Sequence, residues 1–487
     1  MLWACLYFPD FSLQLMLRGT PAQSQSPSDP APLGAAVITS GGNRPHIVSC
    51  NPAARRQGIA PGMTVSAAIA LAPELIERVR DTAAEQRALE GAAAWAGQFT
   101  STVSLLRPDA LLLEIQGSQR LFGGLQTLLL RLAEEVDQIG YTAALALAPT
   151  PTAARLLARS GMGSTITDSA ALEKALHGIP LSLLQQSAET VRMLDIMGVH
   201  TLGECLQLPR DGVARRFGQA LIDEMDRALG RLPDPVTPWI APSRYKSKLV
   251  LPAPVHNTEP LLFAANRLIQ ELTGFLCMKQ AGITRLKLTL HHEDRKPTAV
   301  VLGLSVPSRD AQRISRLLRE RLGTITLPDR VEAITLETTE ARPLDSRNLS
   351  LFPEDRLPDE QRWLIIEHLR ARLGDESVYS IATHGDHRPE LAWRCCEPGT
   401  VAEIPETNTR PLWLLEPAQR LRSDDAGPVL DHPLTLLAGP ERIESGWWDD
   451  AAEARDYFVA ADADGRRFWI FQEREPTPTW FLHGVFA

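Results

Sequence analysis

Apolar positions in the first third of the chain follow two periods, one typical of buried strands and one typical of helices. The chain opens on an apolar run at residues 1–7 that predicts a buried first strand, followed by a short helix to residue 18. Further strands are predicted at residues 35–39, 47–50, 103–106, 110–115 and 141–148, with a β-hairpin between 103 and 115. Helical spacing covers residues 65–71, 83–99 and 123–139, and another helix starts at residue 152 behind two prolines. This order predicts an α+β sheet domain.

The middle of the chain changes pattern twice. Residues 175–232 predict short helices, including a compact pair at 192–197 and 202–208 around a turn at Gly198, and residues 233–242 form a proline-rich linker. Residues 249–342 then predict the order β-α-β-β-α-β, which is typical of a small sandwich of ferredoxin-like type.

The last part of the chain begins with a polar, loop-like segment at residues 345–360 that holds one apolar cluster. A helix is predicted at residues 361–373, and the aromatic-rich end alternates like a small β-module. No apolar run approaches the ~20 residues of a membrane helix, and the first residues lack the basic start of a signal peptide. The six scattered cysteines are expected to be free thiols, so a cytoplasmic, nucleoid-associated protein is predicted.

Charge is distributed unevenly. The net charge is −9, yet residues 244–330 contain 15 Lys/Arg and 7 Asp/Glu, so this stretch carries +8 and the remainder −17. A basic segment in an otherwise acidic chain is typical of a surface that binds the phosphate backbone of a nucleic acid. A solvated basic helix face explains the same count, and charge alone does not separate the two interpretations.

Three local motifs, taken in order, resemble a known family. Ile47-Val48-Ser49 with Ala54-Arg55-Arg56 and Gly58 resembles the fingers motif of Y-family DNA polymerases, in which an arginine holds the incoming triphosphate. Residues 142–149 with Ala154-Arg155-Leu156 resemble the palm strand-to-helix motif, in which a lysine touches phosphate. Residues 193–203 resemble the thumb helix pair that grips the DNA backbone. The resemblance covers residues 1–342, and over its whole length the chain is most similar to the ImuB branch.

The resemblance implies an α+β multidomain fold shaped like a right hand with a C-terminal extension. The implied parts are palm-like 1–34 and 93–168, fingers-like 35–92, thumb-like 169–240, little-finger-like 241–343, a linker 344–360 and a partner-binding region 361–487.

The acids needed for nucleotide transfer are not in place. Transfer needs two divalent cations about 3.5–4 Å apart, held by carboxylates on adjacent strands. The first acid of the family aligns with Tyr7, whose phenol stays neutral at pH 7, while Asp10 lies one residue off register and is expected on the opposite strand face. The Asp-Glu pair of the family aligns with Asp109-Ala110. Asp109 is read as a weak ligand remnant or, preferably, as a solvated turn residue after a proline.

The expected nucleotide pocket has changed too. The aromatic side chain that stacks on the sugar aligns with Ser12, and the fingers tyrosine aligns with Pro52. Arg55 and Arg155 are possible phosphate-binding remnants, or else ordinary charged residues. The thumb hairpin at residues 185–190 has no glycine to offer backbone N–H groups to phosphate.

Basic residues of the little-finger-like part are the candidate DNA contacts. Arg244, Lys246 and Lys248 alternate with other residues, so they share one strand face. Sequence-independent, salt-sensitive binding is expected from the whole set: Arg244, Lys246, Lys248, Lys279, Arg285, Lys287, Arg295 and Lys296.

A short apolar cluster follows that region. Its residues, Asn348-Leu349-Ser350-Leu351-Phe352, resemble the peptide that binds the bacterial β sliding clamp, with asparagine in place of the usual glutamine. Two leucines and a phenylalanine suit an apolar cleft. The alternative is a strand folded onto the tail.

The family resemblance implies a non-catalytic adaptor of translesion synthesis. Its implied partners are DNA, the β clamp, an ImuA-like RecA-related protein and an error-prone polymerase α subunit of replicative type; no cofactor and no membrane are expected. Aromatic residues of the tail are interface or core residues under this hypothesis. One alternative is an active translesion polymerase with Mg²⁺ held by Asp10, Asp109 and Glu114, and another is a DNA-binding protein with no clamp role.

Overall fold

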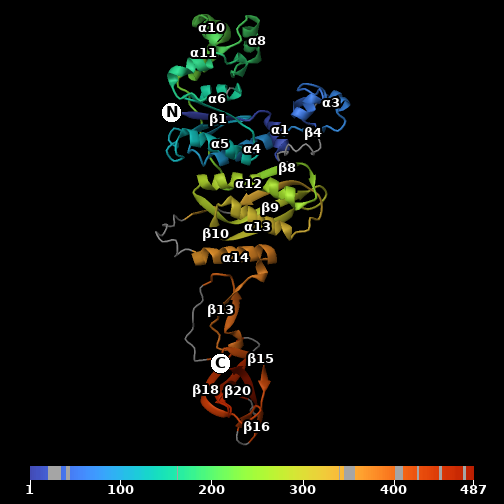
Figure 1. Cartoon of the computed structure of the whole chain (residues 1–487), viewed down its shortest axis with the longest axis vertical. Helices are drawn as coiled ribbons and strands as arrows, with labels where there is room; N and C mark the ends of the chain where they lie inside the picture. The colour runs from blue at the N-terminus through green and yellow to red at the C-terminus, as the bar shows by residue number, and fades with distance from the viewer. Residues whose placement is uncertain are drawn as a thin grey trace. The chain divides into compact units, whose positions relative to one another are not determined.

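The computed structural model describes residues 1–19, 34–39, 44–161, 163–338, 341–344, 357–400, 410–424, 427–448, 452–474 and 479–486, with side chains only from residue 362 in the helix that begins at Leu357. Two compact units divide the chain, Met1–Arg372 and Leu373–Ala487 (Figure 1). The predicted α+β multidomain class with a separate C-terminal β-module is confirmed. Among the described residues, no helix has the length and apolar character needed to cross a membrane.

The palm-like part is a four-stranded antiparallel sheet in the order β5 (Val103–Leu106), β6 (Ala110–Glu114), β1 (Trp3–Tyr7), β7 (Ala144–Ala148). Alternation along β1 sends Cys5 and Tyr7 to one face and Ala4 and Leu6 to the other. Helices α4 (Thr82–Ala96) and α5 (Leu125–Gln138) cover the Leu6 face, and α6 (Pro151–Arg159) covers the Cys5 face. The end of β1 therefore lies beside the end of α6.

The fingers-like part has a three-stranded sheet, β3 (Ile47–Cys50), β2 (Ala35–Ile38) and β4 (Ile76–Val79), with helices α2 (Pro52–Arg56) and α3 (Val65–Leu71). Strand β4 pairs in parallel with β2. Sequence analysis missed β4, because its residues alternate only between half-buried and exposed and leave no apolar run.

Short helices build the thumb-like part, as predicted: α7 (Leu172–Leu176), α8 (Ala188–Ile196), α9 (Leu202–Leu206), α10 (Arg210–Phe217) and α11 (Gln219–Ala228). Between α8 and α9, Gly198 has φ +78°, a conformation that glycine adopts without steric cost. Thr201 caps α9 reciprocally with Glu204, which fixes where this second helix starts.

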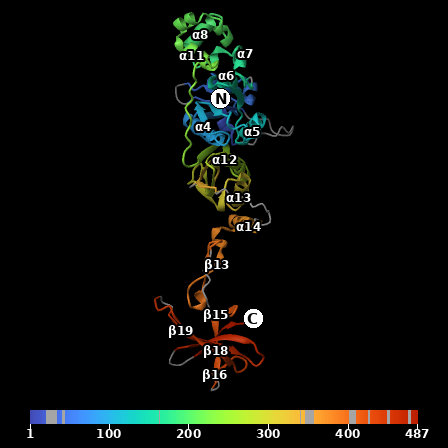
Figure 2. The same ribbon diagram turned by 90° about the vertical axis from the view of Figure 1, so that its left-hand side faces the viewer.

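The little-finger-like part has the predicted β-α-β-β-α-β order. Its elements are β8 (Lys246–Val255), α12 (Thr258–Met278), β9 (Ala281–His292), β10 (Thr298–Ser308), α13 (Ala311–Gly323) and β11 (Val331–Thr338), with a short β12 (Ala341–Pro343) beside β9. Each β-α-β unit is split by a strand of the other in the sheet order β10-β9-β11-β8. Helices α12 and α13 cover one face of this sheet, and α12 also packs against α4 of the palm (Figure 2).

Helix α14 (Leu357–Leu373) lies almost wholly within the first unit, although the predicted tail began at residue 361. The reason is Glu367, which is 2% exposed, accepts a hydrogen bond from the Ser305 backbone of β10 and makes a bidentate ion pair with Arg313.

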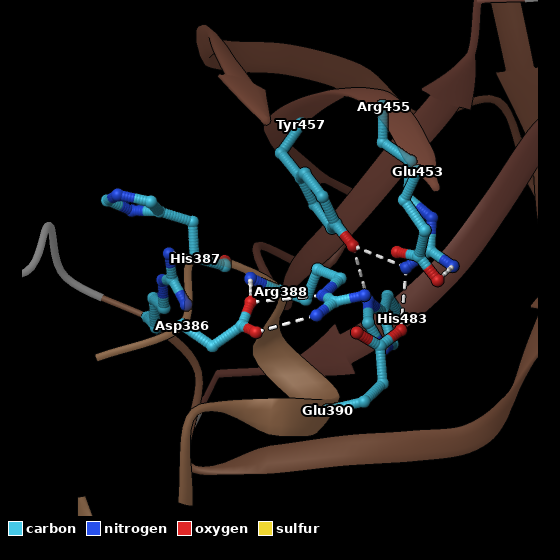
Figure 3. A network of polar contacts seen from close by, with 9 residues as sticks. Asp386, His387, Arg388, Glu390, Glu453, Arg455, Tyr457 and His483 are labelled. Carbon is cyan, nitrogen blue, oxygen red and sulfur yellow. Dashed lines mark hydrogen bonds and ion pairs between the residues drawn. The ribbon is translucent and has the colours of Figure 1, made fainter. Parts of the chain in front are cut away.

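The second unit contains an antiparallel sheet in the order β15 (Trp413–Arg420), β21 (Trp480–Val485), β20 (Arg467–Glu473), β19 (Glu453–Ala461), β18 (Thr435–Ser445). Tyr457, Trp469 and Phe471 are buried in it, as predicted for a small β-module. Figure 3 shows a polar network in this unit: Glu390 accepts a hydrogen bond from Arg455 at 2.6 Å, and the Tyr457 hydroxyl lies 2.8 Å from Nδ1 of His483. His483 is 1% exposed, and burial lowers its pKa.

Candidate functional site

Tyr7 and Ala110 are cross-strand partners on β1 and β6. The two positions that the resemblance aligns with metal-binding acids are therefore neighbours on adjacent strands, the placement that a two-cation site needs. In this chain those positions carry a phenol, which is neutral at pH 7, and a methyl group. Neither side chain is a carboxylate.

Asp109 lies next to this pair in the turn after Pro108, as predicted, but it is half-buried and ion-paired rather than solvated. Its carboxylate forms an ion pair with Arg159, the last residue of α6, and the two side chains are 20% and 25% exposed. The Arg159 guanidinium carbon also lies 4.9 Å from the centre of the Tyr7 ring. Burial raises the pKa of Asp109, and the charge of Arg159 opposes that rise. The sequence offered one indication of this pair, a basic residue in the last turn of the palm helix.

Asp10 is not on a strand, because β1 ends at Tyr7. It precedes α1 (Phe11–Leu17) with φ +47°, and its carboxylate pairs with Arg55 at 3.0 Å. The expectation that Asp10 points from the opposite strand face was therefore wrong.

Glu114 lies at the far end of the hairpin, opposite Trp3 in the register, whereas Ala110 lies opposite Tyr7. Four residues along a strand correspond to roughly 13 Å. The structure thus does not bring together Asp10, Asp109 and Glu114, the three acids of the catalytic alternative. No group of three or more His, Cys, Asp or Glu side chains suited to a metal occurs among the described residues.

A pair of divalent cations does not fit this palm. Hard cations need several oxygen ligands. Asp109, beside the Tyr7–Ala110 pair, is already paired with Arg159, and Asp10 is paired with Arg55.

The predicted nucleotide pocket is also occupied by other contacts. Ser12 lies 3.3 Å from the hydroxyl of Ser49, and Pro52 forms the first turn of α2. Arg55 remains exposed beside Asp10. Arg155, in contrast, is 5% exposed and pairs with Glu224 of α11 at 2.6 Å. A phosphate-binding role for Arg155 is not supported, because a buried, paired guanidinium is not available to a ligand.

Five of the predicted DNA-binding cations lie on or beside one surface, which we call the open sheet face: the sides of β8, β11 and β9 that point away from α12 and α13. Lys246, Lys248, Arg285 and Lys287 project from it, and exposed Arg244 precedes β8 in the same alternation. A groove of about 1010 Å³ along this face is also lined by α4 and by Trp239 of the linker.

An acid that sequence analysis did not single out lies among these lysines. Glu337 of the central strand β11 is opposite Lys246 on one side and Lys287 on the other. Its carboxylate is 3.5 Å from the Lys246 ammonium and 2.8 Å from that of Lys287, and hydrogen bonding to Lys287 lowers the pKa of Glu337. The two lysines therefore share an internal counter-ion.

The other predicted cations are dispersed. Lys279 caps the end of α12 just before β9 begins, whereas Arg295 and Lys296 lie in the loop after β9 ends. Several arginines counted in the +8 segment belong to α13, on the covered side of the sheet. The segment charge therefore overstates the charge of the open sheet face.

The clamp-like residues, Asn348 to Phe352, lie outside the residues that the structure describes. In the second unit, several tail aromatics are exposed rather than buried, in particular Trp413 at 71%, Trp447 at 80% and Trp448 at 61%. In the aromatic-rich end, Trp447 and Trp448 are thus surface residues, whereas Tyr457, Trp469 and Phe471 are buried.

Comparisons with known proteins agree with the sequence resemblance. Residues 32–159 match the model of the impB/mucB/samB family. Protein ImuB of Caulobacter vibrioides (strain NA1000 / CB15N) is 28% identical over 458 residues, covering 88% of this chain and all of that protein. Among solved structures, DinB from Sulfolobus solfataricus matches 71% of this chain and all of its own at 16% identity and a TM-score of 0.39. An insertion ternary complex of Dbh DNA polymerase matches 70% of this chain and 99% of its own at 17% identity and a TM-score of 0.40.

Proposed function

We propose that this chain, for which the comparisons support the ImuB family, is a non-catalytic adaptor of translesion DNA synthesis. One observation carries the proposal: the strand positions for the metal ligands hold Tyr7 and Ala110, while the adjacent Asp109 is paired with Arg159. The adaptor binds DNA and gathers the β sliding clamp and an error-prone polymerase during damage-induced mutagenesis.

The open sheet face is the proposed DNA-binding surface. Its cations project from a regular sheet, so they are spaced to meet successive phosphates without reading bases. The adjoining groove, with Trp239 in its wall, gives a displaced single strand a place to lie beside the duplex.

Replacing Arg244, Lys246 and Lys248 by alanine is expected to weaken binding to a primer-template roughly 10- to 100-fold and to reduce the salt slope by about 2–3, because three phosphate contacts are lost. Fluorescence anisotropy over a salt series measures both. Glu337→Gln is expected to change affinity in the opposite direction, because Lys246 and Lys287 lose their internal counter-ion.

The matched control removes three cations from the other side of the sheet: Arg316, Arg319 and Arg321 of α13, each to alanine. This control is expected to change affinity much less than the open-face variant. Equal losses of DNA affinity in the two triple variants would contradict binding at the open sheet face. They would indicate that affinity depends only on the total charge of the chain.

The hook at residues 348–352 is the proposed clamp contact, and the second unit is the proposed contact for protein partners. Its exposed Trp413, Trp447 and Trp448 are of the type that anchors protein interfaces. An ImuA-like RecA-related protein and a replicative-type polymerase α subunit are the partners that the family suggests.

The adaptor role predicts that DNA and clamp bind one chain together. Mixing the full chain with labelled primer-template and purified clamp, followed by size-exclusion chromatography, is expected to give a complex containing all three. When the error-prone polymerase partner is added as a fourth component, the full chain is expected to retain it, whereas a chain ending at Phe352 is expected to retain only DNA and clamp. Absence of any DNA complex at low salt would refute the proposal.

A further inference from the structure

Arg159 has surroundings that an ordinary surface arginine lacks. Its guanidinium pairs with Asp109 and lies over the Tyr7 ring, and its Nε is buried with no hydrogen-bond partner among the described residues. Three elements meet there: the end of β1, the start of β6 and the end of α6.

The fold sets this position firmly. Helix α6 is fixed at its start by Thr150, whose side chain accepts from the Ala153 backbone, and by Pro151 in its first turn. Arg159 is its last residue, and a helix C-terminus favours a positive charge. The guanidinium is therefore held beside the Tyr7–Ala110 pair.

We infer that Arg159 is the resident cation of this palm and that it blocks divalent metal binding in its own right, apart from the two missing acids. The inference rests on the proposed non-catalytic function and deepens it. A guanidinium stays protonated throughout the working pH range. A metal ion that approaches the Asp109 carboxylate would therefore be repelled by the guanidinium of Arg159, which is already paired with that carboxylate.

A consequence follows for any attempt to restore the site. Introducing acids at residues 7 and 110 places new carboxylates beside Arg159, where the guanidinium neutralises one of them. Restored acids alone then do not form a metal site. Removing Arg159 as well leaves three carboxylates, two on adjacent strands and Asp109 in the turn before β6. Carboxylate oxygens are the ligands that Mg²⁺ and Mn²⁺ prefer.

The test uses the full chain and Mn²⁺ alone, with no DNA or nucleotide. Titrations followed by the electron paramagnetic resonance signal of free Mn²⁺ compare the double variant Tyr7→Asp, Ala110→Glu with the triple variant that adds Arg159→Met. The methionine keeps much of the stem volume, and Arg159→Gln in the same background is a second choice if the methionine variant does not fold by circular dichroism. Arg55→Met added to the double variant is the matched control, since it frees Asp10 at the surface instead of Asp109.

The variants without Arg159 are expected to bind Mn²⁺ about tenfold or more tighter than the double variant, a difference of about 1.4 kcal/mol. Equal affinity of the double and the folded triple variants would overturn the inference, as would tight binding in the Arg55 control. These outcomes are independent of whether the unaltered chain extends primers, so failure of the inference and failure of the proposed function are distinguishable.

Discussion

Replacing Glu271 by alanine is expected to lower the free energy of unfolding of the first unit by about 3–5 kcal/mol, because it leaves a buried charge without its partner. Glu271 of α12 and Arg18, which follows α1, form an ion pair at 2.9 Å in which the side chains are 0% and 1% exposed. Arg18 also donates to the backbone oxygen of Ile139 and lies over the Tyr141 ring. This pair joins the palm-like part to the little-finger-like part.

Chemical denaturation followed by tryptophan fluorescence measures the loss. Glu135→Ala, which breaks the exposed pair with Arg131 on α5, is the matched control and is expected to cost less than about 0.5 kcal/mol. The double variant Arg18→Met, Glu271→Leu is expected to lose less than the sum of the single losses, since neither charge is left alone. A loss under about 1 kcal/mol for Glu271→Ala would show that the pair does not hold the two parts together.

Replacing Leu351 and Phe352 by alanine is expected to weaken clamp binding by about 100-fold or more, because apolar anchors of this kind contribute at least about 2 kcal/mol each when buried at an interface centre. The residues form the apolar cluster of a polar segment, and a short apolar motif in such a segment is typical of a peptide that docks into a partner. Isothermal titration of purified clamp with the full chain gives the affinity.

Asn348→Gln is the matched variant for the same segment. The longer side chain restores the amide arm of the usual clamp-binding peptide, so clamp affinity is expected to rise rather than fall. If the Leu351 and Phe352 double variant binds as tightly as the unaltered chain, the hook is refuted and a DNA-binding protein without a clamp role becomes the better account.

The order of helices and strands could be predicted where the spacing of apolar residues and the positions of turn residues agree. The split β-α-β units of the little-finger-like part and the hairpin at β5 and β6 follow directly from apolar spacing and turn residues. Strand β4 was not predictable, because an edge strand with half-buried residues has no apolar run. Asp10 was misplaced for a related reason: where a strand stops is decided by its pairing partners, and β1 stops at Tyr7 opposite Ala110.

The candidate site shows the same limit for charged residues. That residues 7 and 110 are not acids can be read from the sequence, but the ion-pair partner of each nearby charged residue cannot. Asp109 pairs with Arg159, 50 residues away, and Arg155 pairs with Glu224, 69 residues away. The position of Glu337 between two lysines could not be predicted, because it depends on the order of the strands in the sheet. The spacing of residues along the sequence does not determine that order.

Primer extension on DNA that is demonstrably bound tests the central claim most directly. The full chain is added to a labelled primer-template until fluorescence anisotropy shows that all the DNA is bound. All four nucleotides and Mg²⁺ or Mn²⁺ are then added, and the products are resolved on a sequencing gel. The account predicts full binding with no added nucleotide above the level of a chain-free control. Clear extension that is lost in Asp109→Ala would contradict it and establish an active polymerase with rearranged ligands.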